Sequence, residues 1–358
     1  MLKRRVRTGR VSNARRSALT LAFCSGFLGL AVPSHAQLTL GPLSVGAGLR
    51  TEFISTTPAA GNTANQFLLD DVRLYVSGPV TKNISFMFNT DYDGATNHVG
   101  VLDAVAKIDI APELHIWAGR FLPPSDRANL YGPFYANQWG VYTDGVQDGY
   151  PFIFQGRDNG VLYWGQFTKK VKVSLGAFDG RSATGAPEVL GAARVQVDLW
   201  DAEDGYYLNG TYYGDKNLLS IGGATQYQGG HTASTIDFLM ERKIPKGGAF
   251  TIESEYSNYN RLGGYDARYA KSQGAYGLAS YLFGKKVGIG QFQVLGKYAK
   301  AEFTHGKTAN YSQKTTEVNF NYVIKQFNAR VMSFYRDVRF NAIRTNFWQA
   351  GVGLQVQI

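Results

Sequence analysis

Cysteine is nearly absent from this sequence, since Cys24 is the single example in 358 residues and lies in the amino-terminal segment described below. This scarcity excludes a disulfide-stapled secreted domain and any use of a thiol for catalysis or metal binding in the rest of the chain. After residue 37 the sequence also lacks the run of about 18 apolar residues that a membrane-spanning helix needs. Histidine is sparse too: His98, His115, His231 and His305 stand apart, without metal-ligand spacing or an accompanying Ser or Asp motif. We therefore expect no enzyme active site, no cofactor and no metal site.

The first 36 residues have the order of segments that is typical of a secretory signal peptide. Seven Lys and Arg and no acid occupy residues 1–16, an apolar run covers residues 18–32, and small residues stand at Ser34 and Ala36. We expect cleavage after Ala36; a lipoprotein at Cys24 is disfavoured by the bulky Phe23 before it. Removing seven bases from 37 Lys and Arg leaves 30 against 27 Asp and Glu, a net charge of +3. This small charge gives no reason to expect a nucleic-acid partner.

Alternation with a period of two residues is the dominant pattern in residues 37–358, which we treat as one domain. In the segment 84–92 the even positions are mostly large and apolar and the odd ones small or polar, and residues 348–358 end on six apolar same-face positions. A soluble antiparallel sandwich shows the same alternation. Three further features favour an outer-membrane barrel: short turns alternating with long loops, 14% aromatic residues with many near strand ends, and an apolar final strand.

The pattern predicts an all-β transmembrane antiparallel barrel of about 16 strands. The expected strands are 44–55, 66–77, 83–92, 99–110, 114–121, 157–165, 170–180, 191–199, 217–228, 235–243, 249–259, 275–283, 291–303, 314–324, 328–338 and 346–358. An even number lets the barrel close, so that no backbone edge faces lipid unpaired. Residues 200–216 are ambiguous, because YYLNGTYYG fits either an extra short strand, giving 18 strands, or a structured periplasmic turn.

The third long loop, residues 122–156, is too broken by Gly, Pro, Asn and Asp for a helix, yet too aromatic for a solvated linker. Barrels of 16 to 18 strands leave an aqueous lumen. We expect this loop to fold into the lumen, where its aromatic rings cover the wall and narrow the pore. An outward lid, or packing on a neighbouring barrel, is the alternative.

Four segments of the sequence resemble the phosphate-selective porin O and P family: GRFLPPSDR (119–127), GRDNG (156–160), FLLDDVRLYVSG (67–78) and FMFNTDY (86–92). The resemblance implies a homotrimeric 16-stranded porin with an inward third loop and an anion preference. It also implies a lysine cluster on that loop, and here the sequence departs, because the loop carries one base, Arg127, and no lysine.

The charges that we expect at the pore fall into two groups. The predicted constriction residues are Arg120, Asp126, Arg127, Asp144, Asp148 and Arg157. The predicted residues of the lumen wall include Arg73, Lys107, Arg194, Glu253, Glu255, Lys297 and Arg330. On the polar face of all strands together, six basic residues stand against ten acidic ones, and carboxylate rings favour cations. The wall charges therefore do not support an anion preference. Arg73, Arg120 and Arg157 are each close in sequence to an Asp, which favours a structural role for them.

The function that we expect is passive diffusion of small hydrophilic solutes or ions through a water-filled barrel in the Gram-negative outer membrane. The expected partners are outer-membrane lipids and lipopolysaccharide, further copies of the chain, and the solutes. A plugged or structural barrel that acts with a partner protein is the main alternative, and a barrel enzyme is a weaker one.

Overall fold

The computed structural model describes residues 38–40, 42–94, 96–146, 156–180, 188–262, 271–304, 309–341 and 344–358. The signal peptide predicted for residues 1–36 lies outside these ranges. The strands are β1 (Leu38–Leu40), β2 (Leu43–Pro58), β3 (Ala64–Pro79), β4 (Ile84–Asp93), β5 (His98–Ala111), β6 (Leu114–Phe121), β7 (Asp158–Phe167), β8 (Val171–Phe178), β9 (Leu190–Asp198), β10 (Leu218–Gln228), β11 (His231–Ile244), β12 (Gly248–Asn260), β13 (Lys271–Val287), β14 (Gly290–Thr304), β15 (Tyr311–Lys325), β16 (Ala329–Phe340) and β17 (Phe347–Gln357). Two short helices, α1 (Arg127–Tyr131) and η1 (Pro133–Tyr135), lie between β6 and β7.

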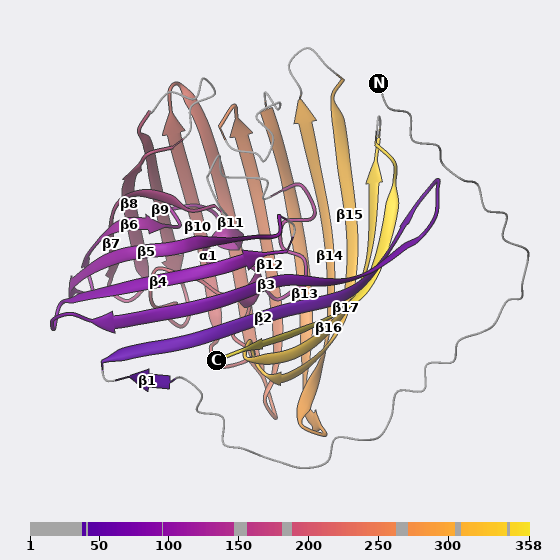
Figure 1. The fold of residues 1–358 in the computed structure, drawn as a ribbon, viewed down its shortest axis with the longest axis horizontal. Helices are drawn as coiled ribbons and strands as arrows, with labels where there is room; N and C mark the ends of the chain where they lie inside the picture. Colours follow the sequence, from indigo (N-terminus) through magenta and orange to yellow (C-terminus); the bar gives the residue numbers. More distant parts are fainter. Residues whose placement is uncertain are drawn as a thin grey trace, which may run out of the picture. The chain divides into compact units, whose positions relative to one another are not determined.

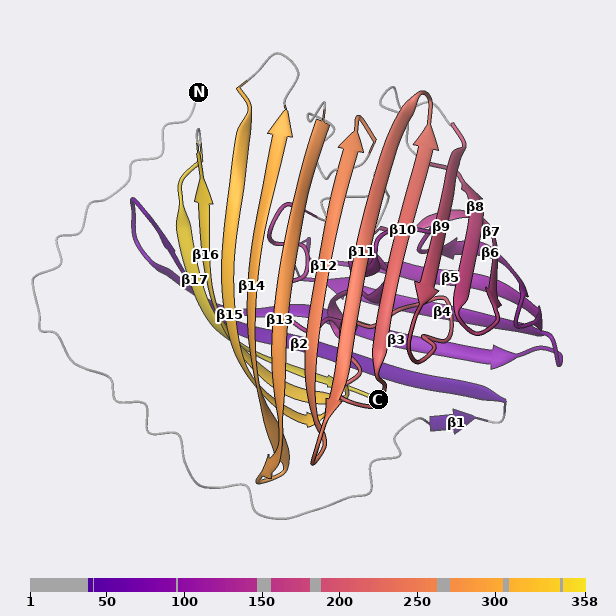
Figure 2. The ribbon, with the colours of Figure 1, turned by 180° about the vertical axis from the view of Figure 1, so that it is seen from behind.

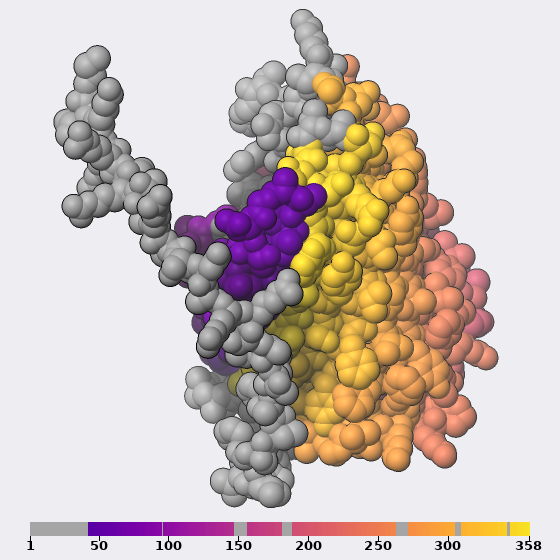
Figure 3. All heavy atoms as spheres, turned by 90° about the vertical axis from the view of Figure 1, so that its right-hand side faces the viewer, coloured from indigo at the N-terminus to yellow at the C-terminus, as the bar shows by residue number. Residues whose placement is uncertain are grey.

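Strands β2 to β17 form a closed antiparallel barrel in which each strand pairs with its neighbours in sequence (Figure 1). The ring closes where β17 pairs with β2, for example Val352 with Phe53, and Figure 3 shows these two ends of the chain side by side. β1 adds a short hairpin partner to β2. The predicted 16-stranded barrel is confirmed, and residues 200–216 form no strand.

The barrel is polar inside and apolar outside. On β15, Val318 and Phe320 are 56% and 53% exposed, whereas the alternating Asn319 and Asn321 are 1% exposed. Successive side chains of a strand point to opposite faces, so this inverted pattern assigns the asparagines to the interior and the large apolar residues to the outer surface. A band of exposed apolar side chains around a closed barrel matches a hydrocarbon surrounding rather than water. The strands of the β9–β15 side are seen in Figure 2.

The two ends of the barrel differ in their connections. We call the end that carries the connections 80–83, 112–113, 168–170, 199–217, 245–247, 288–289 and 326–328 the turn end, and the opposite end the loop end. The expected contrast between short turns and long loops is not uniform. At the loop end, β10 and β11 are joined by Gly229 and Gly230 alone, and at the turn end residues 199–217 are long. Among the described residues no helix has the length and apolar character of a membrane span.

Candidate functional site: a lumen occupied by two inward segments

Residues 122–146, which follow β6, fold inward and are almost entirely buried. Asp126 caps the short helix α1, its carboxylate accepting the Asn129 amide at 2.9 Å. Gly132, with φ of 61°, then turns the chain into η1; this left-handed conformation favours glycine. We call residues 122–146 the inward loop.

Aromatic rings of the inward loop pack on glycines of the wall, as the expectation that they cover the wall requires. A Cβ atom added to Gly48 of β2 would lie 2.7 Å from the Phe134 ring, and one added to Gly353 of β17 would overlap the Trp139 ring. Phe134 and Trp139 are 0% and 4% exposed. Glycine leaves room on the strand for an approaching ring, so these residues form seats for the loop. Burial of each ring contributes about 2–3 kcal/mol.

Wall arginines hold the backbone of the inward loop. Arg330 of β16, with 0% exposure, donates to the carbonyls of Ala136 at 2.6 Å and Phe134 at 3.2 Å. Arg50 of β2 donates to the Trp139 carbonyl at 2.8 Å and pairs with Asp71 at 2.9 Å. Charge-assisted bonds of this kind are roughly twice as strong as neutral ones. The arginines therefore position the loop.

Two further contacts fix the loop to the β12–β14 side of the barrel. Lys297 of β14 pairs with Asp144 at 2.5 Å, and both side chains are 1% exposed. The Tyr131 hydroxyl donates to Glu253 of β12 at 2.8 Å. The loop thus contacts the wall from β2 and β17 to β12 and β14.

Residues 199–217, between β9 and β10, also enter the barrel, from the turn end. We call them the inward turn. Glu241 of β11 accepts hydrogen bonds from the Tyr212 and Gly214 amides at 2.8 and 2.7 Å and from the Thr211 hydroxyl at 2.7 Å. One buried carboxylate therefore satisfies three donors of the turn, which explains why an acid is stable at this interior position.

The inward loop and the inward turn meet at a buried ion pair. Arg127 donates two bonds to Glu203, at 2.8 and 2.6 Å, and both side chains are 0% exposed. Backbone bonds from Leu208 to Leu130 (3.3 Å) and from Gly210 to Tyr135 (2.9 Å) extend the contact. We call this contact the junction.

The environment of the junction shifts the pKa values of two carboxyl groups in opposite directions. Burial by itself would raise the pKa of Glu203, but the charge and hydrogen bonds of Arg127, with Lys172 and Tyr212, lower it to about 2. Burial raises the pKa of Asp126 to about 6, against the hydrogen bonds from Asn129. Glu203 is therefore ionised at neutral pH and held by its arginine, whereas the pKa of Asp126 lies above its ordinary value.

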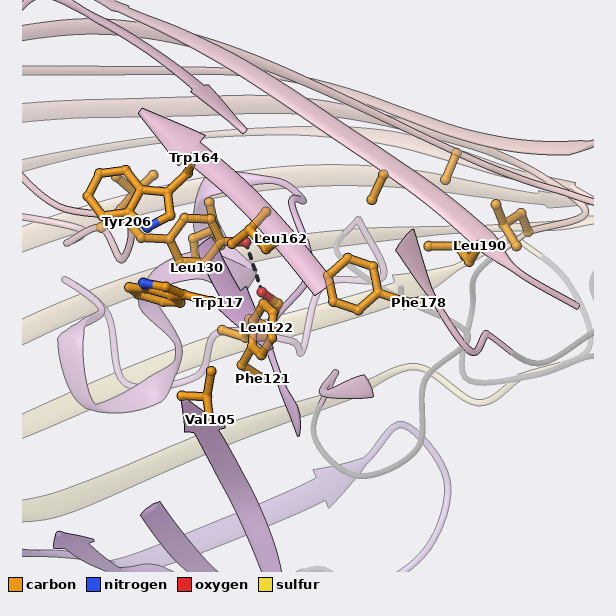
Figure 4. Packing of buried hydrophobic residues seen from close by; sticks show 14 of the residues in the cluster. Val105, Trp117, Phe121, Leu122, Leu130, Leu162, Trp164, Phe178, Leu190 and Tyr206 are labelled. Carbon is orange, nitrogen blue, oxygen red and sulfur yellow. Dashed lines mark hydrogen bonds between the residues drawn. The ribbon is translucent and has the colours of Figure 1, made fainter. Parts of the chain in front are cut away.

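An aromatic and aliphatic cluster packs around the junction on the β5–β9 side (Figure 4). Leu130 from the inward loop and Tyr206 from the inward turn lie with Trp117 and Trp164 of the wall, and the Tyr206 hydroxyl donates to the Leu122 carbonyl at 2.8 Å. The packing fills this part of the interior with side chains.

A cavity of about 590 Å³ remains between the inward segments and strands β2–β5. It extends from turn-end residues, among them Ser77, Asn328 and Ile358, to Arg73, Asp103 and Arg157 farther along the wall. The charged residues that line it are Arg73, Lys107 and Arg157 against Asp103 alone. Basic side chains therefore outnumber acidic ones in the lining of this cavity.

Four wall carboxylates lie outside the cavity, in contact with the inward segments or with wall arginines. Asp237 pairs with Arg194, Glu317 with Arg336, Glu241 binds the inward turn and Glu253 binds the inward loop. Gly222 leaves the space in which Arg194 crosses β10 to reach Asp237 on β11. These carboxylates are buried structural partners and do not line the cavity.

Most of the predicted charged residues lie in the interior. The predicted wall residues Arg73, Arg194, Glu253, Glu255, Lys297 and Arg330 are at most 5% exposed, and Lys107 lines the cavity. Of the predicted constriction residues, Asp126, Arg127 and Asp144 belong to the inward loop, and Arg157 faces the cavity. Asp148 lies outside the described residues.

Arg120 is not part of this group. Its neighbour Phe121 is fully buried in the interior, and Arg120 itself donates to the Val101 carbonyl at 3.0 Å. Arg73 pairs with Asp91 across the strands at 2.9 Å, because residues opposite each other on neighbouring strands share a face.

Sequence reasoning missed Arg50, Arg336 and above all Glu203. Gly48, Arg50 and Glu52 alternate with larger residues on β2, which is the signal that placed other charges on the wall. Glu203 precedes a stretch as rich in aromatic residues as the inward loop, and the same argument predicts that such a stretch needs a surface to cover.

No protein-family model matches this sequence, and no curated protein matches it in sequence. Solved structures do match. OprB of Pseudomonas putida in its high-pH structure has a TM-score of 0.65 at 8% identity, covering 88% of this chain and 94% of its own. An anion-selective porin from Comamonas acidovorans has a TM-score of 0.57 at 11% identity, covering 88% and 99%. The trimer form of OmpT, an outer membrane protein of Vibrio cholerae, has a TM-score of 0.55 at 10% identity, covering 89% and 100%. The fold is that of the Gram-negative outer-membrane porins.

Proposed function

We propose that this protein is an outer-membrane porin that lets small hydrophilic solutes or ions diffuse passively, without catalysis. The observation that carries the proposal is the cavity of about 590 Å³, with four charged side chains in its lining, inside a barrel with an apolar outer surface. The turn end faces the periplasm, and the outer surface contacts lipid and lipopolysaccharide. Solutes pass along strands β2–β5, beside the inward loop and the inward turn.

We infer a modest preference for anions along this route. Three basic side chains and one carboxylate line the cavity, and positive linings favour anions. The excess of carboxylates over the whole wall does not oppose this, since Asp237, Glu241, Glu253 and Glu317 are buried against the inward segments or wall arginines and do not line the cavity. The resemblance to the phosphate-selective porins points the same way, although the inward loop lacks their lysine cluster.

A second candidate is a barrel that stays closed until a partner displaces the inward segments. The observation that favours it is the junction, where Arg127 and Glu203 meet with 0% exposure inside the lumen. In this case the cavity is a blind recess that opens when the junction separates.

The zero-current potential of purified protein in a planar bilayer under a KCl gradient tests these proposals. A potential of the sign expected for chloride supports the anion-preferring porin, and the sign expected for potassium overturns the preference. Folded protein without conductance favours the closed barrel. Unchanged lipids after incubation with the protein support the absence of catalysis, and released fatty acids contradict it.

We also propose a homotrimer, on the likeness to a structure described as a trimer. The mass of the detergent-solubilised protein, measured by light scattering, tests this, and a monomer mass refutes it.

A further inference from the structure

The cavity beside the inward segments has the size and lining of a small-molecule site. Its volume of about 590 Å³ falls within the range of about 300–1,000 Å³ that is usual for such sites. Its lining is largely aromatic and aliphatic, with Met87, Leu122, Leu130, Tyr131, Tyr135 and Phe327 among the contributors. Such a lining accepts an apolar or aromatic body better than a fully hydrated ion.

Lys107 supplies a cation that this lining leaves available. Its ammonium lies 4.2 Å from the centre of the Trp117 ring and 3.5 Å from the Met87 sulfur, and among the described residues it has no carboxylate within 4 Å. The acids that precede and follow it on β5 are already engaged, Asp103 by Arg157 at 3.3 Å and Asp109 by His115 at 2.7 Å.

The other two cations of the cavity are structural. Arg73 pairs with Asp91 and lies 4.6 Å from the Phe134 ring centre, so it supports the inward loop. Arg157 pairs with Asp103. A ligand thus meets one available ammonium, and a phosphate dianion normally requires several converging donors.

Tyr207 and Asn209 of the inward turn complete the lining of the cavity. The Tyr207 hydroxyl is buried without a hydrogen-bond partner among the described residues, so the tyrosine contributes its ring to the lining rather than a polar contact.

We propose that this cavity binds small organic monoanions with an aromatic body, whose carboxylate meets Lys107 and whose ring lies among the tyrosines and Met87. The inference rests on the proposed diffusion of solutes through the barrel and names the class of solute that binds there during passage. Inorganic phosphate and acetate bind more weakly, because neither fills the apolar part of the cavity.

Equilibrium dialysis of folded, detergent-solubilised protein tests the proposal with benzoate, acetate and inorganic phosphate as probes. We expect wild-type protein to bind benzoate at least about tenfold more tightly than either other anion. Lys107→Met weakens benzoate binding by about tenfold or more, and Lys107→Arg, which keeps the cation, retains most of it. Lys300→Met is the matched control, because Lys300 is half-exposed and paired with Glu302 away from the cavity. A change in migration on heating in SDS gels verifies that each variant is folded before it is heated.

Equal binding of benzoate and acetate, tighter binding of phosphate, or equal effects of Lys107→Met and Lys300→Met would each overturn the proposal. Chloride current through the same preparations in bilayers separates the site from the channel. Benzoate should reduce that current with the concentration dependence found by dialysis. Benzoate binding without any current means that the proposed channel function is wrong and the site stands. Current with no benzoate binding means that the site alone is wrong.

Discussion

Breaking the Arg127–Glu203 pair is expected to separate the inward loop from the inward turn and so widen the pore. Glu203→Gln keeps the shape of the side chain but leaves Arg127 as a buried cation without its main counterion. Removing one partner of a buried pair costs about 3–5 kcal/mol. We expect the lower end of this range, because Asp237 remains 3.6 Å from the Arg127 Nε atom.

A loss of about 3 kcal/mol lowers the ratio of closed to open junction by about 100-fold, since about 1.4 kcal/mol corresponds to a factor of ten. The assay is single-channel recording in planar bilayers, where Glu203→Gln should raise the frequency or duration of large openings accordingly. The bonds that Glu241 makes to the inward turn are intact in this variant, so the turn stays attached to the wall when the junction separates.

Asp204→Asn is the matched control for this experiment. Asp204 belongs to the same turn and pairs with Lys216 at 3.0 Å, but its side chain is 74% exposed. Exposed pairs contribute about 0–1 kcal/mol, so Asp204→Asn should leave the openings within about fivefold of wild type. If the two variants behave alike while both remain folded, the junction does not restrict the pore and the reasoning is refuted.

Two further predictions concern pH and packing. The stabilisation by ionised Glu203 is complete above its ordinary pKa of 4.5 and is lost as pH falls toward about 2, so openings should increase over this range in wild type and show no such rise in Glu203→Gln. Because the pKa of Asp126 is raised to about 6, the docked inward loop takes up a proton as pH falls from 7 to 5 and gains stability; openings should decrease over this range, and Asp126→Asn, which still caps α1, should abolish the decrease. Gly48→Ala should displace the Phe134 ring and lower the stability of the folded protein by about 1–3 kcal/mol in denaturant titrations, whereas Gly277→Ala, which meets open space, should change it by less than about 0.5 kcal/mol. A flat pH profile, or equal effects of the two glycine substitutions, would contradict these assignments.

The strands could be predicted from the sequence because each of their faces has one consistent environment. A residue on β15 faces either the polar interior or the apolar surroundings, so alternation of Asn319, Phe320 and Asn321 fixes both the element and its orientation. The ends of strands were harder to predict where the residues on both faces of the strand are small. β13 begins at Lys271 rather than near residue 275, since Ser272–Gly274 pair with β14 although their sequence is typical of a loop.

Inward folding of the third loop could be anticipated from its aromatic residues, but its seats on the wall could not. Gly48 and Gly353 look like ordinary small residues in strands until Phe134 and Trp139 are placed over them. Such contacts join residues about 86 and 214 positions apart, and no local pattern carries that information.

The same limit applies to the charge count of the wall. Counting assumes that every interior side chain faces water equally. The inward turn breaks this assumption, because its backbone amides donate hydrogen bonds to Glu241. Arg127 at the junction likewise lies beside both Asp237 and Glu203. The carboxylates on β11 and β12 are thereby kept out of the lining of the cavity, while Lys107 on β5 belongs to it. Electrostatic selectivity in such a barrel depends on which wall residues the inward segments leave uncovered, and a substitution in the inward turn should therefore change selectivity without altering any residue of the cavity.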